Sequence, residues 1–504
     1  MRQILANRYI LALLVVVAVA AEYGLAFVSH PAALASPRSS APGRATVSTA
    51  VRACPAPGSG GVTAAGVALA TASSGTGEAR IARLTAAGSV TTPAPLHVLT
   101  KAGELALVNV PPAALTRKAT RAPNVTTGAA VPTGPARGGV IIQASGAMAQ
   151  GLEAEQTAAG GLATASCQGP GTSFWFVGPG QKPVADIQLY LMNPESQAAD
   201  ATVEILTDSG PALGSTDAGI GVPAHGLVVQ SLAKLLHGSR VVALNVTTSV
   251  GQVAASVLET AKAGQPGAWL PPAQAPATSQ VLPGLPAAPG GRQLYIAVPG
   301  GDNATVKVTA VTSRGSYQPT GGSGINLPGG SAVSVPLPSL GGIAAAVQIS
   351  SNVPVTASMS VTGGAPGAPG AFTAASGPVQ EQGVIAGNPG GPGSSSVLVL
   401  SAPQGAAQVR VAELSTATAP AVAAPRVVQL AAGHSAVIPL APPRAFGRSF
   451  PFAVVVTPLA GSGPVYAGRV TSAAGVVRSI LPVPSSLSSI PLPAVRNALT
   501  TALP

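Results

Sequence analysis

Charged and aromatic residues are scarce in this chain. Asp, Glu, Lys and Arg make up 8% of its 504 residues, and Phe, Trp and Tyr make up 3%, whereas soluble domains carry about 25% charged residues. A nucleic-acid interface needs clustered Lys and Arg with aromatic residues between them, and the longest basic cluster, residues 116–121, has no aromatic residue nearby. The sequence therefore predicts no nucleic-acid partner. A net charge of +11 still suits a weak attraction to anionic polymers.

Residue patterns that carry catalysis or bind metal are also missing. The five histidines lack the spacing of a zinc site, and the fifteen Asp and Glu form no calcium-binding run. No Gly-x-Ser-x-Gly turn precedes a helix pattern, and no glycine-rich run carries a phosphate-binding lysine. We therefore expect a protein that is not an enzyme, with no catalytic residue, no metal and no cofactor.

Composition disfavours both long helices and disorder. Gly (61) and Pro (50) together exceed a fifth of the chain, and inside a helix they cost about 1 and about 3 kcal/mol each. The hydrophobic content of 46% is too high for a disordered protein. Short strands joined by Gly and Pro turns satisfy both constraints.

The N-terminus combines basic residues with a long apolar run. Arg2 and Arg8 precede an apolar run from Tyr9 to Val28 that is interrupted by Glu22. A run of this length can span a membrane with the rest of the chain outside the cytoplasm, and a shorter apolar core would act as a cleavable signal. We predict a signal peptide or membrane anchor over residues 1–35, with the cytoplasmic membrane as partner, and a flexible stem over residues 36–50.

Four segments repeat one pattern of apolar strands and Gly-rich turns. The turn glycines Gly226, Gly330 and Gly433 are 104 and 103 residues apart, which indicates a repeat of about 100 residues. We predict four β repeats, which cover residues 51–160, 161–265, 266–378 and 379–504, the last with a C-terminal closing strand.

Within each repeat, polar and apolar residues alternate, as in Ala201 to Leu206 and Ala304 to Thr309. This alternation is typical of a sheet with one buried face. About seven short strands per repeat fit an all-β fold of tandem immunoglobulin-like β-sandwiches. The alternative is a closed ring of repeats resembling a β-propeller, although a propeller blade needs only about 40–50 residues. The similar segments 269–286 and 480–495 are expected to be leading strands. In the ring alternative, the second would close the ring by pairing with the first repeat.

The two cysteines, Cys54 and Cys167, both precede predicted strands. In an exported protein two such cysteines usually form a disulfide, here across a loop of about 110 residues that contributes roughly 4–5 kcal/mol. Free structural thiols are the alternative. A reactive thiolate needs a nearby cation or histidine, and no histidine lies within fifty residues of Cys167.

Three aromatic residues, Phe174, Trp175 and Phe176, follow the second cysteine. On a strand the two phenylalanines share one face and Trp175 points to the other. We expect the phenylalanines in the core and Trp175, like Trp269, at a boundary between repeats. The competing interpretation is that Trp175 or Tyr190 is exposed and stacks on a sugar.

Several short motifs resemble a known family. They are Cys54-Pro55-Ala56-Pro57, Cys167, Phe174 to Gly178, Leu189 to Pro194 and Val222 to Ala224. Taken together the chain resembles the actinobacterial exported proteins grouped as domain of unknown function 5719, over most of residues 50–495. The resemblance implies an actinobacterial cell-envelope protein and no particular activity.

The sequence thus favours a non-enzymatic, extracytoplasmic cell-envelope protein that serves as a structural or binding scaffold. It would be secreted or held in the cell membrane by a single pass. Its partners would be anionic cell-wall polymers or envelope proteins. The alternative function is a carbohydrate-binding or glycan-assembly accessory module.

Overall fold

The computed structural model describes residues 13–24, 43–55, 66–110, 138–157, 164–181, 184–212, 219–236, 238–260, 267–287, 290–337, 340–362, 370–391, 393–419, 422–445 and 448–492. Its contacts divide the chain into two units, which are described separately. One unit combines Met1–Thr46 with Ser489–Pro504, and the other is Val47–Ser488.

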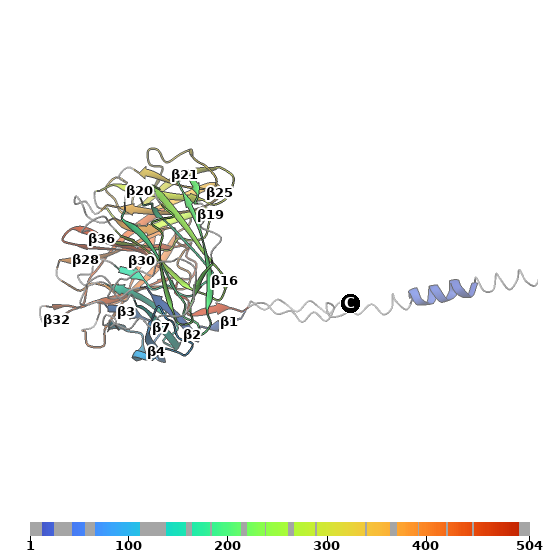
Figure 1. The fold of residues 1–504 in the computed structure, drawn as a ribbon, viewed down its shortest axis with the longest axis horizontal. Coiled ribbons are helices and arrows are strands. Elements are labelled where there is room, and N and C mark those ends of the chain that lie inside the picture. The colour runs from blue at the N-terminus through green and yellow to red at the C-terminus, as the bar shows by residue number, and fades with distance from the viewer. Residues whose placement is uncertain are drawn as a thin grey trace, which may run out of the picture. The chain divides into compact units, whose positions relative to one another are not determined.

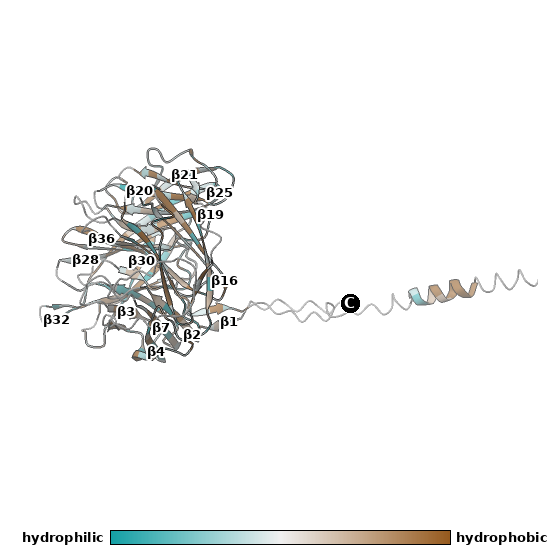
Figure 2. Cartoon of the chain, viewed as in Figure 1, coloured by the Kyte–Doolittle hydropathy of each residue, from teal (hydrophilic) through white to brown (hydrophobic). Residues whose placement is uncertain are grey.

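The described residues of the smaller unit form one helix and one pair of strands. The helix covers residues 13–24 and is coloured as hydrophobic over most of its length in Figure 2. No helix among the described residues is long and apolar enough to cross a membrane, and the remainder of the predicted 1–35 leader lies outside them. β1 (Arg44–Thr46) pairs antiparallel with β37 (Ser489–Pro491), and Arg44 Nε donates to Ser489 Oγ at 2.8 Å. Part of the predicted flexible stem is therefore a strand.

Every regular element among the described residues of the larger unit is a strand, which confirms the predicted all-β class. This unit consists of four tandem sandwiches, and each sandwich has two antiparallel layers. These layers are separate sheets in repeats one, two and four, whereas one long strand joins them in repeat three. In every repeat the first sheet orders its strands first–sixth–third–fourth, and the second sheet orders them fifth–second–seventh–eighth. Each sandwich has eight strand positions, one more than the sequence predicted, although some positions are split into two short strands or share one long strand.

Repeat one comprises β2 (Thr49–Cys54), β3 (Gly66–Ala70), β4 (Gly75–Leu84), β5 (Pro95–Ala102), β6 (Leu105–Asn109), β7 (Gly139–Gly146), β8 (Glu153–Thr157) and β9 (Thr164–Ser166). Repeat two comprises β10 (Ser173–Pro179), β11 (Asp186–Met192), β12 (Ala199–Thr207), β13 (Gly210–Pro211), β14 (Ile220–Val222), β15 (Leu227–Ser231), β16 (Val241–Val250), β17 (Ala254–Thr260) and β18 (Ala268–Leu270). The fourth strand of this repeat is split into β13 and β14.

Repeat three comprises β19 (Ala277–Leu285), β20 (Arg292–Val298), β21 (Ala304–Thr312), β22 (Gly315–Tyr317), β23 (Ile325–Leu327), β24 (Ser331–Leu337), β25 (Ala345–Val361) and β26 (Ala371–Ala374). Its long strand β25 serves as sixth and seventh strand and so joins both sheets. Repeat four comprises β27 (Gly383–Asn388), β28 (Ser394–Ala402), β29 (Ala407–Ser415), β30 (Arg426–Leu430), β31 (His434–Leu440), the small hairpin β32 (Arg444–Ala445) and β33 (Arg448–Ser449), β34 (Phe452–Pro458), β35 (Tyr466–Ala473) and β36 (Val476–Pro482).

Each sandwich buries the apolar side of its alternating strands. In β12, Ala201, Val203 and Ile205 are buried in the core of repeat two, while Thr202 and Glu204 between them are half-buried. The predicted period of two therefore selects the core face, since successive side chains of a strand point to opposite faces.

The outer faces of the sheets are covered by the neighbouring repeats. The first sheet of each repeat packs on the second sheet of the next, and the apolar contacts include Ile141 with Tyr190 between repeats one and two. The same relation joins repeats two and three and repeats three and four. The first sheet of repeat four then packs on the second sheet of repeat one, where Ala386 and Val455 meet Ala68 and Ala70.

The four sandwiches therefore follow in chain order, as predicted, and close into a ring. In Figure 1 the labels pass around this unit from β4 and β7 through β16 and β21 to β28. No sheet among the described strands closes on itself as a barrel. The repeat length is compatible with a ring. Each repeat of about 100 residues forms two four-stranded layers, so each layer uses about as many residues as one propeller blade.

The two segments that were expected to be leading strands also hold last strands. Segment 269–286 leads into repeat three through β19, as predicted, but it begins in β18, which pairs with β17 of repeat two. In the same way segment 480–495 begins in β36, which pairs with β35 and completes repeat four. Among the final strands, β36 lies next to β9 and β26, and β26 lies next to β18.

Candidate functional site

A pocket opens where the final strands of the four repeats end. Its volume is about 470 Å³, which falls within the usual range of about 300–1,000 Å³ for ligand sites. We call it the central pocket because every repeat contributes to its wall. Its lining residues are Arg52, Glu153, Ala165, Ser166, Cys167, Gln168, Gly169, Phe174, Ser256, Trp269, Leu270, Pro271, Pro272, Ala273, Gln274, Ala375, Ser376, Gly377, Leu481, Pro482, Pro484 and Ser485.

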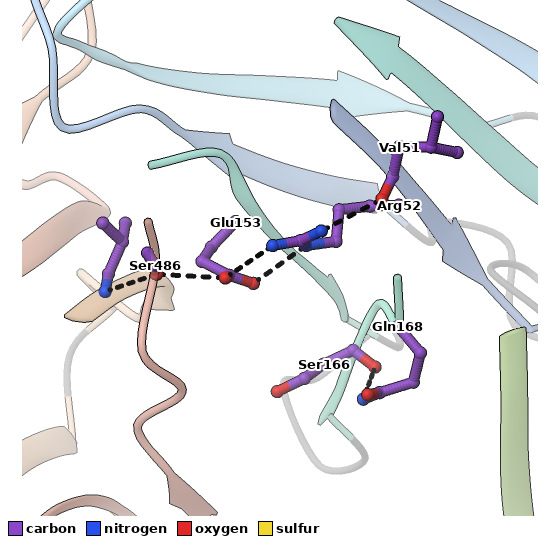
Figure 3. Close-up of polar contacts among 7 residues, drawn as sticks. Val51, Arg52, Glu153, Ser166, Gln168 and Ser486 are labelled. Atoms are coloured by element: carbon purple, nitrogen blue, oxygen red, sulfur yellow. Dashed lines mark hydrogen bonds and ion pairs between the residues drawn. The ribbon is translucent and has the colours of Figure 1, made fainter. Parts of the chain in front are cut away.

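The charged residues in the described part of this wall form one ion pair. Arg52 on β2 donates two hydrogen bonds to Glu153 on β8, from Nη2 to Oε1 at 2.9 Å and from Nε to Oε2 at 3.2 Å. The buried Ser486 from beyond β36 donates its hydroxyl to Glu153 Oε1 at 3.0 Å, as Figure 3 shows. Burial lowers the pKa of Arg52, but the charge and hydrogen bonds of Glu153 outweigh it and raise that pKa above its ordinary value.

The predicted disulfide between Cys54 and Cys167 is present and lies against the pocket. Both cysteines belong to repeat one, because Cys167 follows β9, whereas the sequence placed it at the entrance of repeat two. Beside the bridge, the amide of Ala53 donates to Gln168 O at 2.8 Å and the amide of Gln168 donates to Ala53 O at 2.9 Å. The bridge therefore fixes the strand that carries Arg52 to the segment that carries Gln168.

Two half-buried aromatic rings, Trp269 and Phe174, line the pocket. Trp269 stands on β18, and its ring packs against Tyr190 with centroids 5.2 Å apart and planes tilted by 57°. Tyr190 is buried, so this contact supports the indole ring of Trp269.

Trp175 and Tyr190, the two rings predicted as candidates for sugar stacking, lie outside the pocket. Trp175 is 7% exposed and Tyr190 is 1% exposed, and neither lines the central pocket. The hypothesis that these two rings are exposed is therefore wrong for this structure. Trp175 lies in β10, which packs against repeat three as expected for a boundary residue. Phe176 is fully buried in the core, whereas its partner Phe174 reaches the pocket.

Neutral polar side chains complete the wall. Gln274 is exposed, and among the described residues only its backbone forms hydrogen bonds. Its amide donates to Ala375 O at 2.8 Å, and its carbonyl accepts from Thr356 Oγ1 at 2.7 Å. Ser376 has a buried hydroxyl with no hydrogen-bond partner among the described residues. Such a group is uncommon, since most buried polar atoms are paired.

Other polar candidates do not gather at a site. The part of the chain that the structure describes holds no cluster of three or more His, Cys, Asp and Glu able to hold a metal ion. His225 has a positive φ of 41° in its turn, and its Nδ1 donates to Ser89 O of repeat one at 2.9 Å. It thus joins two repeats.

Sequence reasoning missed the pocket, although a signal for it was present. Segments 269–274 (WLPPAQ) and 481–486 (LPVPSS) share a Pro-rich style. Both leave a final strand and line the pocket or lie beside it. Their equivalence was visible in the sequence, but their meeting point was not.

Comparisons with known proteins identify a family. No significant match is found among curated proteins or among solved structures. A model of a family of unknown function (DUF5719) matches residues 125–441, which begin before β7 and end after β31. The match includes Cys167, the aromatic motif and Trp269, but not Cys54. Because it spans more than half of the chain, the protein belongs to the family of unknown function DUF5719.

Proposed function

We propose that this protein is a non-enzymatic binding scaffold of the cell envelope that works outside the cytoplasm. The observation that carries the proposal is the central pocket, because all four repeats build its wall. A pocket of this size with convergent polar groups and aromatic rings is the usual form of a ligand site. The ring of sandwiches acts as the rigid support.

The disulfide supports an extracytoplasmic location. Bridges such as Cys54–Cys167 form and persist in oxidising compartments and are rare in the cytoplasm. In this proposal the apolar N-terminal segment directs export and either anchors the protein or is removed. The actinobacterial source implied by the family resemblance belongs to the same proposal.

Two measurements in the native cell test the location. Labelling of free thiols before and after reduction reports whether Cys54 and Cys167 are oxidised. Sequencing of the mature N-terminus separates a chain that begins near Ser36 from a retained anchor. Both cysteines reduced in a cytoplasmic protein would contradict the proposal.

A photo-crosslinking experiment tests the pocket. A benzophenone amino acid replaces Gln274, which is exposed at the pocket, or Gln230, an exposed residue on β15 outside it. In the native envelope we expect a crosslinked product from position 274 and none of the same mass from position 230. Identical products from both positions, or none from 274, would contradict a ligand site in the pocket.

A further inference from the structure

The charge of the central pocket differs from that of the whole protein. The chain carries a net charge of +11, yet the charged residues in the pocket wall are Arg52 and Glu153, which neutralise each other through two hydrogen bonds. Among the described residues of this wall an anionic ligand would find no cation other than Arg52, and it would have to separate this pair. The pocket is therefore suited to an uncharged ligand.

The remaining wall presents an aromatic ring next to neutral polar groups. Trp269 is half-buried and held by Tyr190, so its ring is ordered before a ligand arrives. Gln274 offers an amide that can both donate and accept hydrogen bonds. Gln168 and Ser485 also line the wall, although Gln168 Nε2 already donates to Ser166 O at 3.0 Å and Ser485 Oγ already accepts from the amide of Gln380 at 3.1 Å. The hydroxyl of Ser376 lacks a partner among the described residues.

A sugar ring matches this arrangement. Its faces carry C–H groups that pack on an aromatic ring, and its rim carries hydroxyls that exchange hydrogen bonds with amides. The wall is also stiff, because prolines such as Pro271 and Pro482 fix the backbone and offer no amide donor of their own.

We propose that the central pocket binds a neutral saccharide, with Trp269 as the stacking ring and Gln274 as a hydrogen-bonding residue at the mouth. This inference rests on the proposed function, because it takes the central pocket to be the ligand site. It moves the sugar-binding role from Trp175 and Tyr190, which are buried, to a different ring.

Calorimetric titration of the purified full chain tests the proposal. The neutral probes are maltose, lactose, mannobiose and N,N′-diacetylchitobiose, and the anionic probe is digalacturonic acid. We expect at least one neutral disaccharide to bind and the anionic probe to bind at least about tenfold more weakly than it. Failure of every neutral probe, or preference for the anionic one, would overturn the proposal.

Two variants locate the binding site. Trp269→Ala should weaken binding of the best neutral probe at least about tenfold, and Gln274→Ala should weaken it about threefold to tenfold. Because Trp269 also packs on Tyr190, its variant needs a melting curve to show that it folds. Gln274→Ala keeps every backbone hydrogen bond and decides the question if the tryptophan variant does not fold. Trp175→Phe, outside the pocket, is the matched control and should bind like the wild type.

The two proposals fail in different ways. Unchanged binding in both pocket variants would remove the saccharide from the pocket. If no neutral probe binds but a specific product still forms from position 274 in the cell, the ligand class is wrong and the binding scaffold stands. A reduced cytoplasmic protein without such a product contradicts both.

Discussion

Two contacts between repeats differ at one equivalent position of the seventh strand. In repeat one, which contacts repeat four, this position is Glu155. In repeat three, which contacts repeat two, it is Ser358. The positions are equivalent because Glu155 pairs with Ala68 in the second strand and Ser358 pairs with Tyr295 in the second strand of its own repeat. Repeat one therefore pairs the small Ala68 with the carboxylate of Glu155, whereas repeat three pairs the large ring of Tyr295 with the hydroxyl-bearing Ser358.

The closing contact is polar at its centre. Arg469 of repeat four is fully buried, and its Nη1 lies 3.0 Å from Glu155 Oε2 of repeat one. The same Nη1 donates to the carbonyl of Gly387 on β27. A side chain at Gly387 would come within 2.8 Å of Glu155 Oε2, so glycine makes room for the pair.

The contact between repeats two and three is mainly apolar. Tyr295 and Phe372 of repeat three pack into the core of repeat two, and the Ser358 hydroxyl donates to the carbonyl of Val177. Glu259 of repeat two has a buried Oε2 without a hydrogen-bond partner among the described residues. The charge of Glu259 adds to the effect of burial in raising the pKa of Tyr295.

The difference follows from connectivity. Repeats two and three are adjacent in the chain, so loose packing cannot separate them far, whereas repeats four and one meet only after the whole ring has formed. A buried ion pair adds little net stability but strongly penalises a wrong partner. We interpret Glu155–Arg469 as the contact that selects the first repeat as the partner of the last.

The largest effect is expected from the disulfide, which belongs to the repeat that receives the closing contact. Cys54→Ala/Cys167→Ala should lower the free energy of unfolding by about 4–5 kcal/mol, the chain-entropy value for a separation of 113 residues. Urea unfolding checks this. Wild type with a reducing agent should match the variant, and an unchanged midpoint would show that the bridge does not support the ring.

Arg469→Ala should lower the free energy of unfolding by about 3–5 kcal/mol, because Glu155 is left buried without its partner. Urea unfolding measures the loss, and faster amide exchange in β8 and β27 would locate it at the closing contact. The control Arg410→Ala removes an exposed arginine from β29 and should cost under about 0.5 kcal/mol.

A double variant sharpens the same test. Glu155→Leu/Arg469→Leu removes both charges and should recover most of the stability that the single variant loses. Equal losses in the single and double variants would mean that packing of Arg469, and not its charge, holds the contact.

Acidity should distinguish the two contacts. Burial raises the pKa of Glu259 from 4.5 to about 7, so the folded protein retains a proton that the unfolded chain releases between these values. The free energy of unfolding therefore falls as pH rises through this window and levels off above about pH 7. Glu259→Gln should be more stable than wild type by about 2–3 kcal/mol at pH 8 and nearly equal at pH 4. Thermal unfolding at both pH values checks this, and a pH-independent difference would contradict it.

The smallest effect is expected at the hydroxyl between repeats two and three. Ser358→Ala removes one hydrogen bond to Val177 and should cost about 1 kcal/mol in urea unfolding. A loss as large as that of Arg469→Ala would mean that the two contacts are equally dependent on polar groups.

The fold class was predictable because it depends on local patterns. Alternation in segments such as Ala201 to Leu206 already assigns the buried face. The disulfide was predictable because the chain has two cysteines and its N-terminus predicts export. Closure of the ring was not, because it depends on single residues such as Glu155 and Ser358 that look like ordinary polar positions of a strand.

The pocket was harder to predict for a related reason. Its wall collects a few residues from each repeat, just after the final strands, and the distances between these residues exist only once the ring has closed. Trp269 was correctly expected near a boundary between repeats. Its opening onto the pocket depends on neighbours from three other repeats, which no local pattern encodes.

The packing of the first sheet of repeat four on the second sheet of repeat one also limits how this architecture can evolve. An open array lengthens by duplicating a unit, since only its ends change. Here an added unit would have to be inserted between surfaces that already match, and every angle around the axis would have to shrink. The number of copies is therefore set by the shape of each sheet, so variation is expected in turns and single side chains before it is expected in copy number.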